Sequence, residues 1–215
     1  RLKIKSATIN KVDDNVTKII GPPIKIKCDF LCVSGGWTPT VHLFTQSRGK
    51  LIYRDYDGSF IPNQSFQDTV SIGSCNGTFS LNEILDETYV KIKEALLSFN
   101  INIRIDQKYK SKTTKNNHHK HAWLIPSSKH FGRTKMFVDL QNDVTSKDIK
   151  LALREGFRSI EHVKRYTTTG MATDQGKTSN INALGIISDT TNTKIEKLGT
   201  TTFRLPYTPV TFGAL

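Results

Sequence analysis

The chain has 215 residues, with 31 lysines and arginines against 19 aspartates and glutamates, and a formal net charge of +12. Hydrophobic residues make up 36% and charged residues 23%, which excludes a disordered chain, and no apolar run approaches the ~18 residues of a membrane helix. The three cysteines form no dense framework, so the sequence favours a reducing, cytoplasmic location over a disulfide-stabilised secreted fold.

Residues 1–104 are predicted to form strands, turns and one helix. Residues 24–27 alternate apolar and basic side chains, as a half-exposed strand does. Residues 30–33 are a continuous apolar run, which is typical of a strand buried on both faces, and we expect their neighbouring cysteines to be buried as well. This segment is therefore expected to lie inside a sheet.

A hairpin turn is predicted at residues 54–58 and a further short strand at residues 69–72. Ser80 and Glu83 have the spacing of a capping box, which predicts the start of a helix. The expected apolar face of this helix contains Leu81, Ile84, Leu85, Ile92, Ala95 and Leu96. Strands followed by glycine turns and a helix together favour an α/β sheet.

Residues 105–135 lack a clear period and are predicted to be a basic loop or linker. Lysines gather in residues 108–115, and histidines follow in residues 118–121. A solvated loop is the favoured interpretation, because the segment offers little apolar area to bury. Nucleic-acid binding and zinc binding are the alternatives. No zinc-finger, RNP or basic-zipper pattern accompanies the lysines, and the adjacent His118 and His119 rarely share a metal.

Residues 136–199 are predicted to form a small helical module, because four apolar-periodic segments are joined by short glycine-containing turns. The expected starts and stops are Thr145 to Gly156, Ser159 to Gly170, a third helix from Lys177, and Thr193 to Gly199. Residues 200–215 are rich in threonine and proline and are predicted to be an extended connector.

Residues 170–178 resemble a phosphate-binding P-loop, but five residues separate the glycines where that motif requires four. The remaining argument is the predicted helix start, where free N–H groups and the helix dipole favour an anion. Lys177 adds a positive charge, and the neighbouring donors are Thr178, Ser179 and Asn180. An anion site and a plain helix cap are supported equally by these residues.

Two glycine-rich turns are further candidates for binding a nucleotide. Residues 34–39 follow the predicted buried strand, and residues 73–77 precede the predicted helix. Turns at the carboxyl ends of parallel strands are common ligand sites, but the chain lacks the G-x-G-x-x-G fingerprint. The histidines that lie outside the basic loop form no catalytic arrangement with serine or cysteine.

Long motifs of the chain resemble the α subunit of heterotetrameric sarcosine oxidases. The motifs lie at residues 32–39, 42–50, 137–145, 154–168, 170–180 and 200–209. The resemblance covers most of the chain outside residues 1–20 and 100–130. It implies that the chain is an internal or truncated piece of a much longer subunit.

The resemblance also implies an α+β fold. Residues 1–104 would be the C-terminal part of a dinucleotide-binding α/β domain, and residues 200–215 would lead towards a folate-binding domain. Residues 136–199 resemble a small [2Fe–2S]-binding domain. The cysteine ligands of that domain align with Asp139, Gln141, Asp174 and Ser179. Because such a cluster requires thiolates, we expect no iron–sulfur cluster and no other metal.

The family's activity is the oxidative demethylation of sarcosine to glycine, with the one-carbon unit passed to tetrahydrofolate. The resemblance implies that the β subunit holds FAD and the sarcosine site, that FMN lies between α and β and is bound covalently to β, and that NAD lies in α. Partners would be the β subunit and also γ and δ, with neither nucleic acid nor membrane. Neither this segment nor any of its residues is expected to be catalytic.

The site residues implied in this way fall into two groups. The FMN-binding group, around the vacated cluster loop, contains Lys177, Thr178, Ser179, Asn180, Arg165, Thr201 and Tyr207. The NAD-binding group contains Gly35, Gly36, Trp37 and Thr38. Two alternatives stay open: a segment of a related proline or secondary-amine dehydrogenase, and a scaffold subunit without a nucleotide.

Overall fold

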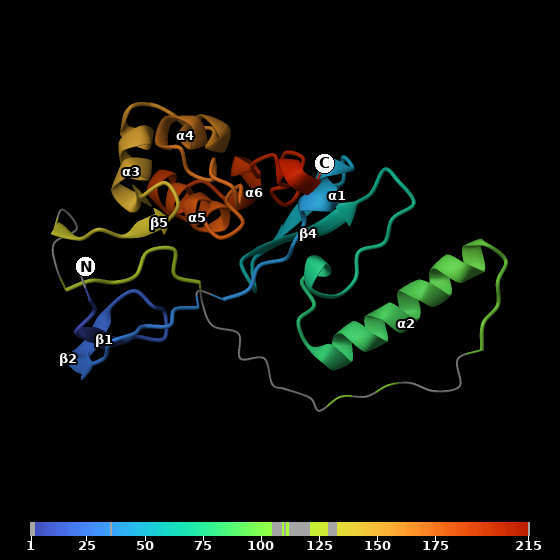
Figure 1. The fold of residues 1–215 in the computed structure, drawn as a ribbon, viewed down its shortest axis with the longest axis horizontal. Helices are drawn as coiled ribbons and strands as arrows, with labels where there is room; N and C mark the ends of the chain where they lie inside the picture. Colours follow the sequence, from blue (N-terminus) through green and yellow to red (C-terminus); the bar gives the residue numbers. More distant parts are fainter. Residues whose placement is uncertain are drawn as a thin grey trace. The chain divides into compact units, whose positions relative to one another are not determined.

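The computed structural model describes residues 3–34, 36–104, 109, 111, 121–128 and 133–214. The chain forms two compact units, and each is made of two separate stretches of sequence (Figure 1). The first unit comprises Arg1–Trp37 and Lys120–Thr200, and the second comprises Thr38–His119 and Thr201–Leu215.

The first unit contains two antiparallel hairpins and four helices. Its elements are β1 (Ser6–Val12), β2 (Ile19–Lys27), β5 (Phe137–Asp139), β6 (Val144–Thr145), α3 (Ser146–Arg154), α4 (Ile160–Thr167), α5 (Asn180–Thr191) and α6 (Ile195–Leu198). Strand β1 pairs with β2 in a register that places Ile9 opposite Ile24, and the short β5 pairs with β6. The strand predicted at residues 24–27 is thus the end of β2.

Helices α3, α4 and α5 pack together around the apolar core of the first unit (Figure 1). Each helix contributes fully buried side chains at helical spacing: Ile149, Ala152, Val163, Ala183, Leu184, Ile186 and Ile187. Burying this many aliphatic groups gives the module its main stabilisation, at roughly 1.5–3 kcal/mol for each large side chain. Helices thus form within the stretch predicted to be helical, in a compact unit that also includes residues 1–37.

Local capping fixes the first of these helices where the sequence predicts it. The backbone N–H of Thr145 donates to Asp148 Oδ2 at 2.8 Å, and the two residues form a capping box at the predicted start of the helix. At the other end, Gly156 takes a left-handed φ of 98°, as a residue just past a helix does.

The later helix boundaries differ from the prediction. Helix α4 ends at Thr167, before Gly170, because Thr168 already takes a left-handed conformation with φ 64°. Helix α5 begins at Asn180, because the turns after Gly170 continue through Lys177. The short α6 is capped at Lys194, one residue after the predicted Thr193.

The described residues of the second unit form one hairpin and one long helix. Its elements are α1 (His42–Gln46), β3 (Lys50–Arg54), β4 (Ser59–Gln64), the 3-10 turn η1 (Gly73–Asn76), α2 (Leu81–Ser98) and η3 (Phe212–Ala214). The predicted hairpin and the helix start after Ser80 are confirmed, although the Ser80 side chain makes no capping hydrogen bond. The short α1 was not predicted.

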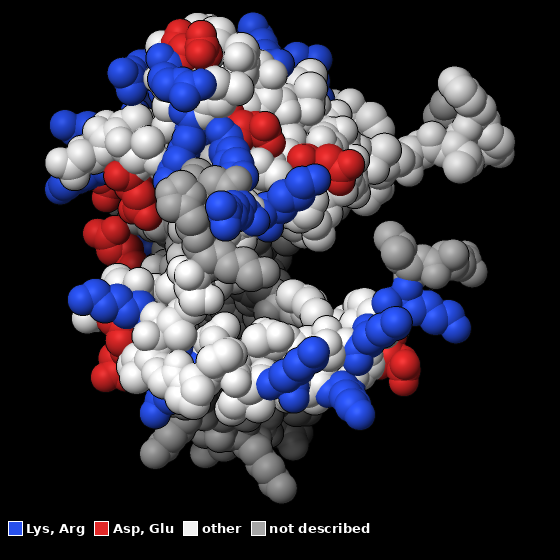
Figure 2. Space-filling model, turned by 90° about the vertical axis from the view of Figure 1, so that its left-hand side faces the viewer, with Lys and Arg blue, Asp and Glu red and all other residues white. Residues whose placement is uncertain are grey.

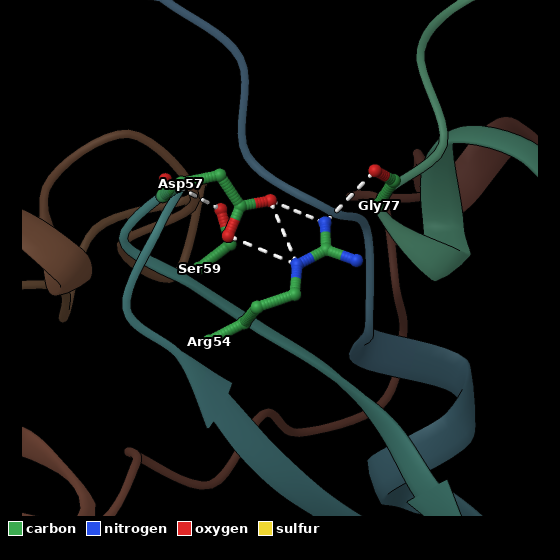
Figure 3. Close-up of polar contacts among 4 residues, drawn as sticks. All are labelled: Arg54, Asp57, Ser59 and Gly77. Carbon is green, nitrogen blue, oxygen red and sulfur yellow. Dashed lines mark hydrogen bonds and ion pairs between the residues drawn. The ribbon is translucent and has the colours of Figure 1, made fainter. Parts of the chain in front are cut away.

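An arginine joins the hairpin to the turn that precedes α2 (Figure 3). The Nε atom of Arg54 donates to both carboxylate oxygens of Asp57 at 3.0 Å, and its Nη2 atom donates to the carbonyl of Gly77 at 2.9 Å. The Asp57 carboxylate raises the pKa of the Arg54 guanidinium above its ordinary value. The contact therefore stays charged and ties η1 to the end of β3.

The apolar run at residues 30–33 does not form the predicted buried strand. Phe30 is 80% exposed, Cys32 is exposed and Cys28 is half-buried, so the expected burial of these cysteines is wrong as well. An apolar run becomes a central strand only when strands flank it on both sides, and none does so among the described residues. Residues 69–72 likewise form no strand.

The described residues thus give a mixed α/β architecture with three two-stranded antiparallel hairpins, and the α/β sheet predicted for residues 1–104 is absent from them. Within the same residues, no helix is long and apolar enough to cross a membrane. Most of the predicted basic loop at residues 105–135 lies outside the described residues. On the face shown in Figure 2, lysines and arginines are interspersed with acidic side chains.

Candidate functional site

The loop between α4 and α5 carries most of the predicted FMN-binding residues. It opens with Thr168 in a left-handed conformation and takes that conformation again at Gly170, Gln175 and Gly176. A Cβ atom on either glycine would overlap the side-chain amide of Asn180. The glycines are therefore required because the Asn180 side chain occupies the space beside them.

The Asn180 side chain has a structural role in this loop. The Nδ2 atom donates to the carbonyl of Gln175 at 3.1 Å. The backbone N–H of Asn180 donates to the carbonyl of Gly176 at 2.9 Å. The residue is buried at the first position of α5. In this structure Asn180 thus holds the loop in shape, which differs from the predicted contact with a ligand.

A buried carboxylate connects this loop to the β5–β6 turn. Asp139 is 2% exposed, and its Oδ2 atom accepts the N–H of Gly170 at 2.7 Å. Its Oδ1 atom accepts the N–H groups of Gln141 at 2.9 Å and Asn142 at 3.2 Å. The hydroxyl of Thr173 adds a contact to Gln141 Oε1 at 3.3 Å. The structure therefore joins the two loops that carry the four aligned cluster positions.

A second carboxylate, Asp174, accepts hydrogen bonds from the donors that were assigned to a phosphate. Its Oδ1 atom accepts the N–H of Gly176 at 3.1 Å, and its Oδ2 atom accepts the hydroxyl of Thr178 at 3.2 Å. Sequence reasoning identified Asp174 only as a cluster position. The preference of aspartate for capping nearby backbone N–H groups is the signal that would have identified both Asp139 and Asp174.

Two of the predicted FMN residues keep features that suit an anion. Lys177 is half-buried and brings its charge to the loop. Ser179 is 1% exposed, and its buried hydroxyl has no hydrogen-bond partner among the residues that the structure describes. An orphaned buried hydroxyl costs free energy, roughly 1–3 kcal/mol, until a partner approaches it.

The other predicted FMN residues lie elsewhere. Arg165 is exposed in the last turn of α4, in the same unit as the loop. Thr201 and Tyr207 belong to the second unit, where the Tyr207 ring lies 5.2 Å from the ring of His42. Their predicted closure of the FMN site stays a prediction.

The predicted NAD turn lies where the two units divide. Gly35 is outside the described residues, Gly36 has φ 111° with open space beside it, and Trp37 and Thr38 are exposed. The buried strand that was to place this turn at a sheet edge does not form. The assignment to NAD therefore loses its geometric argument and rests on the resemblance alone.

A hollow in the first unit was not anticipated from the sequence. It has a volume of about 470 Å³ and is bordered by the β1–β2 turn, residues 121–127, Met136 and Asp189. Burial raises the pKa of Asp189, and the charge of Lys150 partly opposes this shift. Within the described residues, no group of three or more histidine, cysteine or acidic side chains is placed to hold a metal ion.

Known proteins resemble the chain along most of its length. Residues 133–215 match the family model described as the sarcosine oxidase A3 domain. The chain is 36% identical over 200 residues to sarcosine oxidase subunit alpha of Corynebacterium sp. (strain P-1), and 38% identical over 198 residues to that of Rhizobium meliloti (strain 1021). These matches cover 91% and 88% of the chain but only 21% and 19% of the two relatives. The predicted resemblance to these α subunits is confirmed, and the chain spans about a fifth of their length.

A solved structure shares the fold. The crystal structure of L-proline dehydrogenase from P. horikoshii superposes with a TM-score of 0.66 over 96% of this chain and 43% of that chain. The two sequences are 19% identical, so this likeness concerns the fold alone. It confirms a mixed α/β fold like that of a dehydrogenase chain.

Replacing Asp139 by Asn is expected to destabilise the first unit by about 2–4 kcal/mol. The amide carries no charge and has one oxygen instead of two to accept the three backbone N–H groups. Urea unfolding followed by tryptophan fluorescence measures the loss. The exposed Glu155→Gln is the matched control and should change stability by less than about 0.5 kcal/mol. Equal effects of the two variants would show that the Asp139 contacts contribute little.

The chain is expected to bind no iron, since the four aligned cluster positions lack cysteine and all three cysteines precede residue 76. Iron and acid-labile sulfide are measured after anaerobic purification. Stoichiometric amounts of both would contradict the expectation.

Proposed function

We propose that the chain serves as a segment of the α subunit of a sarcosine oxidase-like flavoenzyme, an oxidoreductase acting on the CH–NH group of sarcosine. The single observation that carries the proposal is the 36–38% identity to such subunits over about nine-tenths of the chain. The proposed role is non-catalytic: the segment supplies nucleotide contacts and part of the interface with a β subunit. Partner subunits follow from the relatives' designation as subunit alpha.

The proposed cofactor at the α4–α5 loop is FMN, with its phosphate near Lys177. The orphaned hydroxyl of Ser179 and the charge of Lys177 support this placement. Thr178 and the Gly176 N–H fit it only after they leave Asp174, because that carboxylate accepts both donors. The phosphate would supply the negative charge that Lys177 neutralises, and FAD and tetrahydrofolate would be bound elsewhere in the complex.

Two substitutions in this loop are expected to change FMN binding in opposite directions. Lys177→Ala in the assembled enzyme should weaken it by about 1.5–3 kcal/mol, the usual value of a charged hydrogen bond, or slow covalent flavinylation. Asp174→Asn should strengthen or accelerate it, because the variant removes a negative charge that competes with the phosphate. FMN and FAD contents are measured separately, so that a general assembly defect is recognised.

Lys197→Ala is the control, since it removes the same charge from the exposed face of α6. Unchanged FMN content and flavinylation rate in both loop variants would exclude this placement of the phosphate. A loss in Lys177→Ala that Lys197→Ala reproduces would indicate a general effect of net charge.

NAD is proposed to contact Gly35, Gly36, Trp37 and Thr38. Trp37→Ala should weaken NAD binding to the assembled enzyme at least tenfold, because an exposed indole offers a stacking surface for a nucleotide. Isothermal calorimetry measures the affinity, and Phe30→Ala, which removes an equally exposed aromatic ring nearby, is the control. If the two variants bind NAD with equal affinity, Trp37 does not contact NAD.

The second candidate function is that of a segment of a proline or other secondary-amine dehydrogenase. The superposition on L-proline dehydrogenase favours it at the level of fold. The assembled enzyme separates the two: turnover of sarcosine with oxygen supports the first proposal, and turnover of proline with an artificial acceptor supports the second. If the assembled complex contains no flavin, the remaining interpretation is that the chain belongs to a scaffold subunit without a nucleotide.

A further inference from the structure

The second unit contains a five-residue helix whose own sequence gives no reason for it to form. Helix α1 has no side-chain capping hydrogen bond, no acidic residue in its first turn and no basic residue in its last turn. Helices as short as this are unstable in water, because starting a helix costs more free energy than a single turn returns. Contacts with another part of the chain must therefore hold α1 in its helical form.

These contacts are made by His42, the buried residue among the five that form α1, all of which the structure describes. The His42 side chain is enclosed by two aromatic rings that come from residues 201–215. The centroid of its imidazole lies 3.7 Å from that of the Phe203 ring, and 5.2 Å from that of the Tyr207 ring in an edge-on arrangement. Figure 1 shows this C-terminal segment beside α1. Two segments that lie far apart in the sequence thus meet at His42.

Residues next to this contact are buried in both segments. Pro39 and Val41 are buried just before His42, and Thr201 is 3% exposed at the start of the C-terminal segment. Tilted and edge-on aromatic rings attract one another in addition to the apolar area that they bury. The residues that lead into α1 are therefore fixed by burial and by the ring contacts together.

The turn that was proposed to contact NAD directly precedes this buried segment. Thr38 ends the turn and is exposed, whereas the next residue along the chain, Pro39, is buried. His42 lies four positions after Thr38, so a displacement of α1 also displaces the end of the turn. The turn therefore takes its position from the segment that His42 anchors.

We propose that Phe203 and Tyr207 are positioning residues for the nucleotide turn, because their rings hold His42 and thereby set the position of Thr38. The inference rests on the proposed function, since it concerns the turn assigned to NAD. It gives Tyr207 a role within the second unit, which differs from the contact with FMN that the resemblance implies. The two aromatic residues act through His42, and no contact of their own with the nucleotide is required.

The test replaces Phe203 in the assembled enzyme. Phe203→Leu removes the ring but keeps an apolar side chain, and it should weaken NAD binding about fivefold to tenfold, because α1 loses its closest ring contact. Phe203→Tyr keeps the ring and should bind NAD within about twofold of the unaltered enzyme. Phe212→Leu is the matched control, since Phe212 lies in the same unit and is 96% exposed. Isothermal calorimetry measures the affinities, and FMN and FAD contents are recorded for each variant.

Hydrogen exchange of residues 38–46 gives an independent measurement. Phe203→Leu should accelerate this exchange at least about tenfold, and Phe203→Tyr and Phe212→Leu should leave it unchanged.

Unchanged NAD affinity or unchanged exchange in Phe203→Leu would overturn the proposal, as would a loss of affinity that Phe203→Tyr or Phe212→Leu reproduces. If FMN and FAD are lost from Phe203→Leu together with NAD affinity, the contact supports the whole subunit, and the proposal is overturned as well. If the unaltered enzyme binds no NAD, the proposed NAD contact itself fails, and the role of the two rings in positioning it fails with it.

Discussion

The buried carboxylate of Asp139 is the contact on which the geometry of the α4–α5 loop depends. It accepts three backbone N–H groups from two segments more than 25 residues apart in sequence, and it lies where water cannot replace it. Charged acceptors form hydrogen bonds about twice as strong as neutral ones. Gly170 is fixed in this way, and the positions of Lys177 and Ser179 follow from the loop that starts there.

The described residues of the two units differ in how much apolar side-chain surface they bury. In the first unit, aliphatic residues recur on the facing sides of α3, α4 and α5. Each of these helices therefore covers aliphatic side chains of its neighbours. In the second unit, Arg54 and Glu87 supply polar contacts that fix η1 between the hairpin and α2, but Val41 is the one large apolar side chain buried among the described residues of this unit. Polar contacts of this kind set geometry, while apolar burial supplies most of the folding free energy.

The sequence predicted the features whose causes are local. Thr145, Ser159 and Gly156 mark helix ends because capping involves residues only a few positions apart. It failed at residues 30–33, because burial of an apolar run depends on strands from elsewhere in the chain. The start of α5 was missed for a related reason: Gly170 and Gly176 shape the loop around Asn180, and a periodicity argument does not detect such a contact.

Aspartates stand at two of the four positions that the resemblance aligns with cluster ligands, and both make contacts that shape the loops. A thiolate in an iron–sulfur site is an anionic acceptor for neighbouring backbone N–H groups. The Asp139 carboxylate accepts two N–H groups of its own turn, and the Asp174 carboxylate accepts the N–H of Gly176 in its own loop. Asp139 is buried, and its carboxylate joins the β5–β6 turn to Gly170. Asp174 is half-buried and accepts the hydroxyl of Thr178 and the N–H of Gly176 within its own loop.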